Sequence, residues 1–230
     1  VHPATVWGGD QTFRVNVQQT QALFAALSPT RCRGIHYFST ASLLNEKHQF
    51  QTASLRQGTD YIRSKACMHE YLSQGGPIPV HLYYPTVIFG GDHQHPQTPV
   101  SAFLSQVPRH LHWVKWLYIR AFFHWIHAAD IAQIIAYRIA QNAPPASVVL
   151  GNPAISVMEL QQELLEHYRQ KVPLWRLDLE KCLPLLLPVL SGQMSAWDRF
   201  SLNHRDLRYV TVHAKTYGLV PFAERITQLL

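Results

Sequence analysis

The sequence predicts an α/β fold built around a parallel sheet. Helix-like and strand-like segments alternate along most of its 230 residues, and this alternation favours parallel βα units over an all-β fold or a helical bundle. Hydrophobic residues make up 47% of the chain and charged residues 15%, so enough apolar side chains are present for a sizeable core. The same composition excludes an intrinsically disordered chain.

Two helix and strand pairs are predicted in the first part of the chain. Residues 10–27 carry apolar side chains at helical spacing, and residues 34–40 follow as a short β-rich run. Residues 61–72 predict a second helix. Residues 79–87 predict a second strand, with prolines near its ends where a sheet tolerates them. The pattern is that of repeated helix and strand units.

The alternation continues to about residue 169. Residues 129–142 have isoleucines on one helical face, and residues 147–150 form a short candidate for a buried strand. The next helix, over residues 156–169, begins with Ser156 and Glu159 in the Ser-x-x-Glu spacing of a capping box. Beyond this helix, leucines and prolines replace the alternation.

Charge and hydropathy exclude several classes of protein. The net charge of +6 is spread along the chain without a basic run, so nucleic-acid binding is not predicted. The longest nearly apolar stretch, residues 182–194, is shorter than the roughly 20 residues of a spanning helix, so no transmembrane segment is predicted. Residues 110–125 are apolar, aromatic and basic. A membrane-surface helix is a weak interpretation there, because the aromatic side chains do not sort onto two faces.

Cysteine and histidine contents predict neither disulfides nor a metal site. Cys32, Cys67 and Cys182 are scattered and form no C-x-x-C pair, so we expect a reducing compartment and a cytoplasmic protein. The 14 histidines include close pairs, but no cysteines or convergent acidic residues accompany them. The chain opens at Val1 in strand-like sequence, so we expect a fragment without its N-terminus, and this sequence gives no basis for assessing targeting signals.

Tyr61 and Lys65 form the first chemical pair. They are four residues apart in a predicted helix and therefore share one face. A phenol with a pKa near 10 acts as an acid or base at neutral pH only if its phenolate is stabilised, and a neighbouring ammonium does this. Ser39, Thr40 and Ser42, at the end of the preceding strand, offer hydroxyls to complete the set. The alternative is a solvated helix face and an ordinary Ser/Thr turn.

Five segments in order carry a resemblance to a known family. They read FSTAS, YIRSK, LYYPTVIFGGD, WIHAADIA and LGNPAISVMEL. The chain to about Leu165 resembles the extended short-chain dehydrogenase/reductases, the NAD-dependent epimerase/dehydratase family. The resemblance implies a partial Rossmann-like, doubly wound parallel sheet that lacks its first strands, over residues 1–150, with a substrate-side insertion near 91–123. It also implies a smaller, mostly helical C-terminal substrate-binding region over residues 151–230.

The resemblance also implies roles for individual residues. Tyr61 would be the general acid or base, and Lys65 would lower its pKa and hold the nicotinamide ribose. Thr40, with Ser39 as the next best candidate, would hydrogen-bond the substrate oxygen. Asn16 would support the catalytic set from behind the site. The residues expected to line the dinucleotide are Pro3, Ala4, Thr5, Asn16, Ser39, Tyr61, Lys65, Pro85, Thr86 and Val87.

Departures from the family pattern limit the expectation. The chain has no G-x-x-G-x-x-G turn, which truncation would explain. Tyr84 stands where the family commonly has the arginine of an R-P pair. Phe123 aligns with an arginine that binds the substrate's diphosphate, so we expect a small carbonyl or alcohol substrate rather than a nucleotide sugar. Ala41 and Ser42 occupy the places of the extra carboxylate of dehydratases, which disfavours dehydration.

The resulting prediction is an NAD- or NADP-dependent oxidoreductase or epimerase that transfers a hydride at a carbinol or carbonyl carbon. The choice of cofactor stays open because the phosphate-binding turn is absent. We expect the chain itself to be inactive without its N-terminal segment, and the resemblance suggests a homodimer. One alternative is a non-catalytic dinucleotide-binding regulator or scaffold, against which Tyr61 and Lys65 both argue. Another is an inactive fragment without a stable fold.

Overall fold

The structure, a computed structural model, describes residues 9–91, 106–182, 195–206 and 208–230. The chain forms two compact units that interleave in sequence. The first holds Val1–Pro85, Pro144–Val149 and Met194–Asn203, and the second holds Thr86–Ala143, Leu150–Gln193 and His204–Leu230. The chain passes from the first unit to the second after Val149. The sequence analysis placed a domain boundary after residue 150. The cofactor and substrate roles of the two predicted regions stay a prediction.

A three-stranded sheet forms the centre of the first unit. Its strand order is β1 (Ile35–Phe38), β2 (Val80–Pro85) and β7 (Ser147–Leu150). Strands β1 and β2 are parallel and in register from Ile35 opposite Val80 to Phe38 opposite Tyr83. A parallel pair needs a crossover, which here contains α3 (Ala53–Gln57) and α4 (Asp60–Ser73). The predicted α/β fold with a parallel sheet is therefore confirmed.

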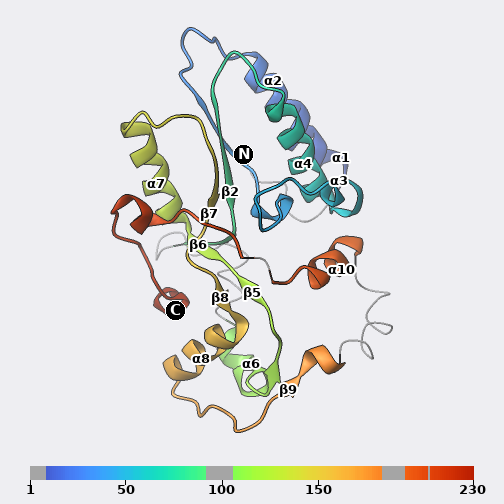
Figure 1. Ribbon diagram of the computed structural model, residues 1–230, viewed down its shortest axis with the longest axis vertical. Coiled ribbons are helices and arrows are strands. Elements are labelled where there is room, and N and C mark those ends of the chain that lie inside the picture. Colours follow the sequence, from blue (N-terminus) through green and yellow to red (C-terminus); the bar gives the residue numbers. More distant parts are fainter. Residues whose placement is uncertain (1–8, 92–105, 183–194, 207) are drawn as a thin grey trace. The chain divides into compact units, whose positions relative to one another are not determined.

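The helix predicted before β1 is present but contains a π-helical turn. It consists of α1 (Asp10–Phe13), the turn η1 (Arg14–Gln19) and α2 (Thr20–Ala25) in succession. The segment packs along α4 (Figure 1). Asn16 is buried within η1. Such turns occur frequently at functional sites.

The core of the first unit lies under α4. Ile62 and Ala66 are buried on one side of α4 and pack with Leu43, the last residue of the short helix η2 (Ala41–Leu43). Trp197, from α10 (Ala196–Asn203), covers this cluster. Fully burying a side chain such as Leu43 or Ile62, relative to leaving it exposed, contributes about 1.5–3 kcal/mol. The cluster thus fixes α4 relative to the segment that follows β1.

The second unit combines short strands with two longer helices. Its elements are β3 (Val87–Phe89), α6 (Val107–Val114), β4 (Leu117–Tyr118), β5 (Phe122–Phe123), β6 (Trp125–His127), α7 (Ala128–Ala140), β8 (Ile155–Ser156), α8 (Val157–His167), β9 (Leu177–Asp178), η3 (Ala214–Tyr217) and η4 (Ile226–Leu229). Pairing is parallel for β3 with β6 and for β4 with β9, and antiparallel for β5 with β8. The pairs join segments far apart in sequence.

Two apolar clusters hold the second unit together. Phe89 and Trp125 pack against Ile226 near the C-terminus, while Leu111 of α6 packs against Leu164 of α8. The capping box predicted at the start of α8 is confirmed, since the Ser156 and Glu159 side chains each bond the other's backbone N–H.

Two expectations about secondary structure need correction. The strand predicted over residues 79–87 is two strands, β2 and β3, interrupted at Thr86, whose N–H and hydroxyl both donate to the Leu150 carbonyl. The region before β6, to which the sequence analysis assigned no helix or strand, contains α6, β4 and β5. None of the described helices is long and apolar enough to cross a membrane.

Candidate active site

Helix α4 positions the predicted Tyr61 and Lys65. Thr59 caps the helix by accepting the Ile62 N–H at 3.4 Å, and Ile62 packs with Leu43 and Ala66. The Lys65 ammonium donates to the Phe38 carbonyl oxygen at 2.8 Å. The pair is therefore not a solvated helix face, because its lysine contacts the end of β1.

Aromatic rings surround the Lys65 ammonium. Its nitrogen lies 5.0 Å from the centre of the Tyr37 ring and 5.9 Å from the centre of the Tyr61 ring. Burial lowers the pKa of Lys65 to about 8, because the charged form loses hydration. Burial also raises the pKa of Tyr61. The resemblance implies that Lys65 lowers the pKa of Tyr61. Burial of the Tyr61 phenol acts in the opposite direction.

The strand-end hydroxyls fall into two different environments. The Thr40 hydroxyl caps η2, where it accepts the Ser42 N–H at 3.4 Å and donates to the Ser42 hydroxyl at 3.3 Å. The Ser39 hydroxyl is buried and has no hydrogen-bond partner among the described residues. Thr40 therefore has the geometry of a Ser/Thr turn, and Ser39 has an unused donor and acceptor at the end of β1.

Asn16 connects the π-helical turn to α4. Its side-chain amide donates to the Ser64 hydroxyl at 3.0 Å, and that hydroxyl donates to the backbone carbonyl of Tyr61 at 2.7 Å. Both side chains are buried. Asn16 thus contacts the backbone of α4, through Ser64, at the residue that carries the phenol.

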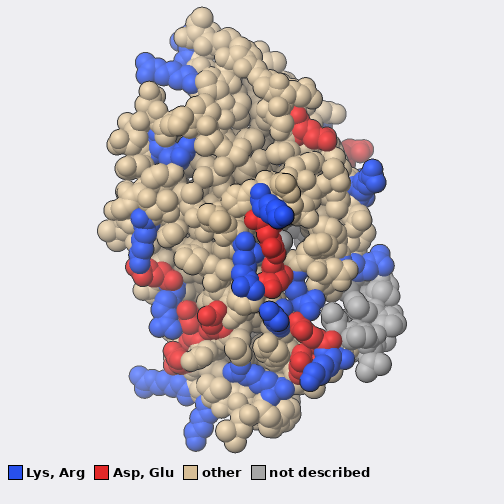
Figure 2. Space-filling view, viewed as in Figure 1, with Lys and Arg blue, Asp and Glu red and all other residues tan. Residues whose placement is uncertain are grey.

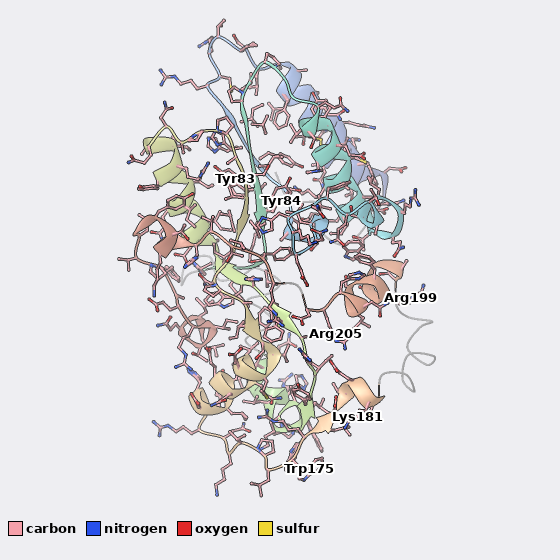
Figure 3. The ribbon with its side chains drawn as sticks, in the orientation of Figure 1. Tyr83, Tyr84, Trp175, Lys181, Arg199 and Arg205 are labelled. Atoms are coloured by element: carbon pink, nitrogen blue, oxygen red, sulfur yellow. The ribbon has the colours of Figure 1, made fainter. Side chains whose placement is uncertain are left out.

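Four further residues, which the sequence analysis did not single out for this site, belong to its surroundings. The Tyr37 hydroxyl is buried without a hydrogen-bond partner among the described residues. The Tyr84 hydroxyl, on β2 (Figure 3), hydrogen-bonds Nδ1 of His69 at 2.7 Å, and Phe50 stacks on His69 with ring centres 4.5 Å apart. Tyr84, noted as a departure from the family, is buried and thus pairs with a half-buried residue one turn beyond Lys65.

Sequence patterns could have indicated two of these residues, Tyr37 by strand alternation and His69 by helical spacing. Tyr37 precedes Ser39 by two positions in the strand, which places both on one face. His69 follows Lys65 by four positions and so continues the face of α4 that begins with Tyr61. Nothing in the local pattern indicated the pairing of His69 with Tyr84.

The cofactor contacts of the remaining residues predicted to line a dinucleotide stay a prediction. Pro3, Ala4 and Thr5 lie outside the described residues. Pro85 is the last residue of β2. Thr86 and Val87 belong to the second unit.

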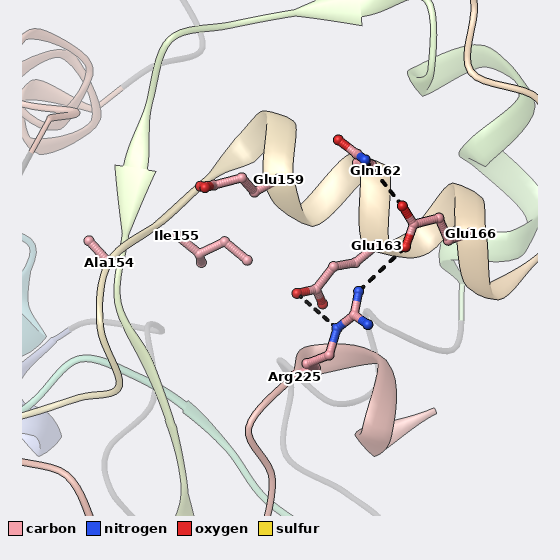
Figure 4. Close-up of a pocket in the computed structure, with 7 residues that line it drawn as sticks. All are labelled: Ala154, Ile155, Glu159, Gln162, Glu163, Glu166 and Arg225. Carbon is pink, nitrogen blue, oxygen red and sulfur yellow. Dashed lines mark hydrogen bonds and ion pairs between the residues drawn. The ribbon is translucent and has the colours of Figure 1, made fainter.

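A separate recess of about 320 Å³ lies in the second unit (Figure 4). Arg225 ion-pairs there with Glu163 at 3.3 Å and with Glu166 at 3.6 Å. Glu159, in the same recess, bonds the Ser156 backbone and hydroxyl in the helix cap. Arg225, Glu163 and Glu166 are thus occupied with one another, and Glu159 with the helix cap. No group of three or more potential metal ligands occurs among the described residues.

Comparisons with known proteins point to one family. The sequence profile of the NAD dependent epimerase/dehydratase family matches residues 2–151. The structure resembles the crystal structure of gox2253, with a TM-score of 0.65 and 16% identity over 89% of this chain and 67% of that one. No curated protein sequence matches the chain significantly.

Two other solved structures are similar. DesIV from Streptomyces venezuelae, a dTDP-glucose 4,6-dehydratase solved with NAD bound, has a TM-score of 0.56 and 17% identity over 96% of this chain and 66% of its own. PA4631 from Pseudomonas aeruginosa, a nucleoside-diphosphate-sugar epimerase, has a TM-score of 0.55 and 13% identity over 93% of this chain and 69% of its own. The chain spans between 54% and 69% of such structures. At these identities the likeness establishes the fold.

Proposed function

The chain belongs to the NAD dependent epimerase/dehydratase family, and from that premise we propose that it is an NAD(P)-dependent oxidoreductase or epimerase. Tyr61, Lys65 and the strand-end hydroxyls of Ser39 and Thr40 form its catalytic set. The observation that carries the proposal is the Lys65 ammonium, held at 2.8 Å by the Phe38 carbonyl beside those hydroxyls.

The residues present fit the nicotinamide and ribose part of such a cofactor. Ser39 and Tyr37 have buried hydroxyls without partners among the described residues, and buried polar groups of this kind normally have partners. Together with Lys65 they offer the donors and acceptors that a ribose diol requires. Bound NAD(P) supplies the hydride acceptor or donor at the nicotinamide ring. The chain contains no glycine-rich turn for the pyrophosphate.

Each residue of the set has a distinct task. Tyr61 moves the proton to or from the substrate oxygen. Lys65, whose pKa burial lowers to about 8, is mainly protonated at neutral pH and favours the tyrosinate. Thr40 hydrogen-bonds the substrate oxygen after giving up its local bond to Ser42. Asn16 is a positioning residue, since it reaches Tyr61 only through Ser64.

The substrate is a small carbonyl compound or alcohol. Two of the similar proteins are named for nucleotide-sugar reactions, but Phe123 replaces the arginine expected to bind a diphosphate. The absence of a carboxylate at Ala41 and Ser42 disfavours dehydration. A homodimer and either nicotinamide cofactor are part of the proposal.

The test is a fluorescence titration of the full-length protein with NADH and NADPH, followed by turnover assays. Tyr61→Phe should remove turnover and leave nucleotide affinity nearly unchanged, whereas Lys65→Met should weaken both. Tyr71→Phe, elsewhere on α4, is the matched control and should retain both activities. Retained turnover in Tyr61→Phe would exclude the proton-transfer role. If the wild type bound nucleotide but turned over none of the carbonyl and alcohol compounds tested, the non-catalytic scaffold would be favoured.

A further inference from the structure

The loop between α8 and β9 exposes large apolar side chains. Leu174 is fully exposed, and Val172 and Trp175 are 51% and 65% exposed. Single exposed apolar residues are common on proteins, but a contiguous group marks an interaction surface. We call residues 171–176, with the sequence KVPLWR, the apolar loop.

The apolar loop continues into the C-terminal end of α6. The rings of Trp175 and Trp116 are in contact, with centres 5.1 Å apart, and the Leu177 N–H donates to the Trp116 carbonyl at 2.7 Å. Trp113 is 69% exposed, and Val114 beside it is also exposed. Helix end and loop therefore form one apolar surface.

A buried glutamine fixes the base of this surface. The Gln161 amide of α8 donates to the carbonyls of Val114 and Leu117 at 2.7 and 3.2 Å. The pairing of β4 with β9 holds the other side of the loop. The exposed side chains thus project from anchored backbone. Trp175 lies at the lower end of the view in Figure 3.

The charges around the apolar surface are mostly positive. Lys171 and Arg176 flank the loop, and the Lys115 ammonium lies 5.9 Å from the Trp116 ring centre. None of these three cations has a carboxylate partner among the described residues. Residues 109–116 and 168–181 together hold six Lys and Arg against two acidic residues, a net charge of +4. Figure 2 shows Lys and Arg side chains, with some Asp and Glu, around an uncharged tip at the lower end of the view.

We propose that the apolar loop and the end of α6 bind the surface of an anionic lipid bilayer. Tryptophan favours the boundary between lipid headgroups and acyl chains, and aliphatic side chains such as Leu174 insert just below it. Lys171, Arg176 and Lys115 then meet the lipid phosphates. A single-stranded nucleic acid would use the cations and tryptophans but offers no contact for fully exposed leucine. A second copy of the chain would bring like charges together.

The test measures co-sedimentation of the full chain with phosphatidylcholine vesicles, with and without about 30% phosphatidylserine. Binding should be at least about tenfold tighter to the anionic vesicles. Leu174→Ser combined with Trp175→Ser should weaken it about tenfold or more, since both apolar anchors are lost. Val210→Ser with Val220→Ser is the matched control, because these valines are 81% and 84% exposed and lie outside the apolar surface. Circular dichroism should show that all variants are folded.

A charge-reversal variant separates the insertion of apolar side chains from the electrostatic attraction to anionic lipids. Lys171→Glu with Arg176→Glu should abolish the preference for phosphatidylserine. The proposal is overturned if neither vesicle binds the wild type, or if the valine control loses as much affinity as the loop variant. It is also overturned if the loop residues are instead required for binding poly(U) or for dimerisation in the absence of lipid.

Discussion

Replacing Lys65 by methionine probes the ammonium at the centre of the candidate site. Burial lowers the pKa of Lys65 from 10.5 to about 8, because the charged form is poorly hydrated against the Tyr37 ring. Methionine has an unbranched, flexible side chain and no charge. The variant therefore removes the titrating group and keeps much of the packing.

The wild-type free energy of unfolding should rise as the pH increases from about 8 toward 10.5. In this range the unfolded chain keeps a proton that folded Lys65 has released, so the unfolded state binds more protons and stability increases with pH. One pKa unit corresponds to about 1.4 kcal/mol. The difference between 10.5 and about 8 therefore corresponds to on the order of 3 kcal/mol. Near pH 10 the tyrosines act in the opposite direction, because burial raises the pKa of Tyr61 and of Tyr37.

Urea unfolding between about pH 7 and about pH 10 measures this effect. The difference in unfolding free energy between wild type and Lys65→Met should grow in favour of the wild type by about 2–3 kcal/mol across the range. Lys47→Met, at an exposed lysine, should show a constant difference. A constant difference for Lys65→Met as well would refute the burial of the Lys65 ammonium.

Two further predictions concern the surroundings of α4. Asn16→Ala should lower the unfolding free energy by about 1–3 kcal/mol, because the buried Ser64 hydroxyl loses its donor. In the same variant kcat should fall while the affinity for NADH changes little. Denaturation, turnover and titration assays check these three quantities. Gly58→Ala should destabilise by about 1–3 kcal/mol or more, since a Cβ there would lie 2.2 Å from a backbone oxygen of α3. Gly76→Ala, where nothing lies within 4 Å, should leave the melting temperature unchanged; equal melting temperatures for both variants would contradict the steric argument.

Local patterns predicted the parts of the site that a single element determines. Tyr61 and Lys65 share a face because four residues make about one helical turn, and this holds whatever packs against α4. Ser156 and Glu159 likewise form a cap from contacts within one helix. Such features depend on spacing alone, so the sequence was sufficient for them.

Features that join distant segments were beyond these patterns. Which hydroxyl at the end of β1 has a partner depends on how η2 winds after it, so the sequence analysis ranked Thr40 above Ser39 by family resemblance alone. The His69 and Tyr84 bond joins α4 to β2 and has no local signature. The apolar surface of the second unit combines Trp113 with Trp175, which helical periodicity in residues 110–125 alone does not reveal.

The π-helical turn around Asn16 has a consequence for changes of chain length. A π turn holds one more residue than an α turn, which rotates the helix beyond it by about 100° relative to an uninterrupted helix. Thr12 and Asn16 are buried, whereas α2, after the turn, buries none of its side chains. Deleting a single residue within Arg14–Gln19 would therefore restore regular α-helical pairing and at the same time swing α2 about its axis. This short segment therefore sets the rotation of α2 relative to α1, and the two helices face different surroundings.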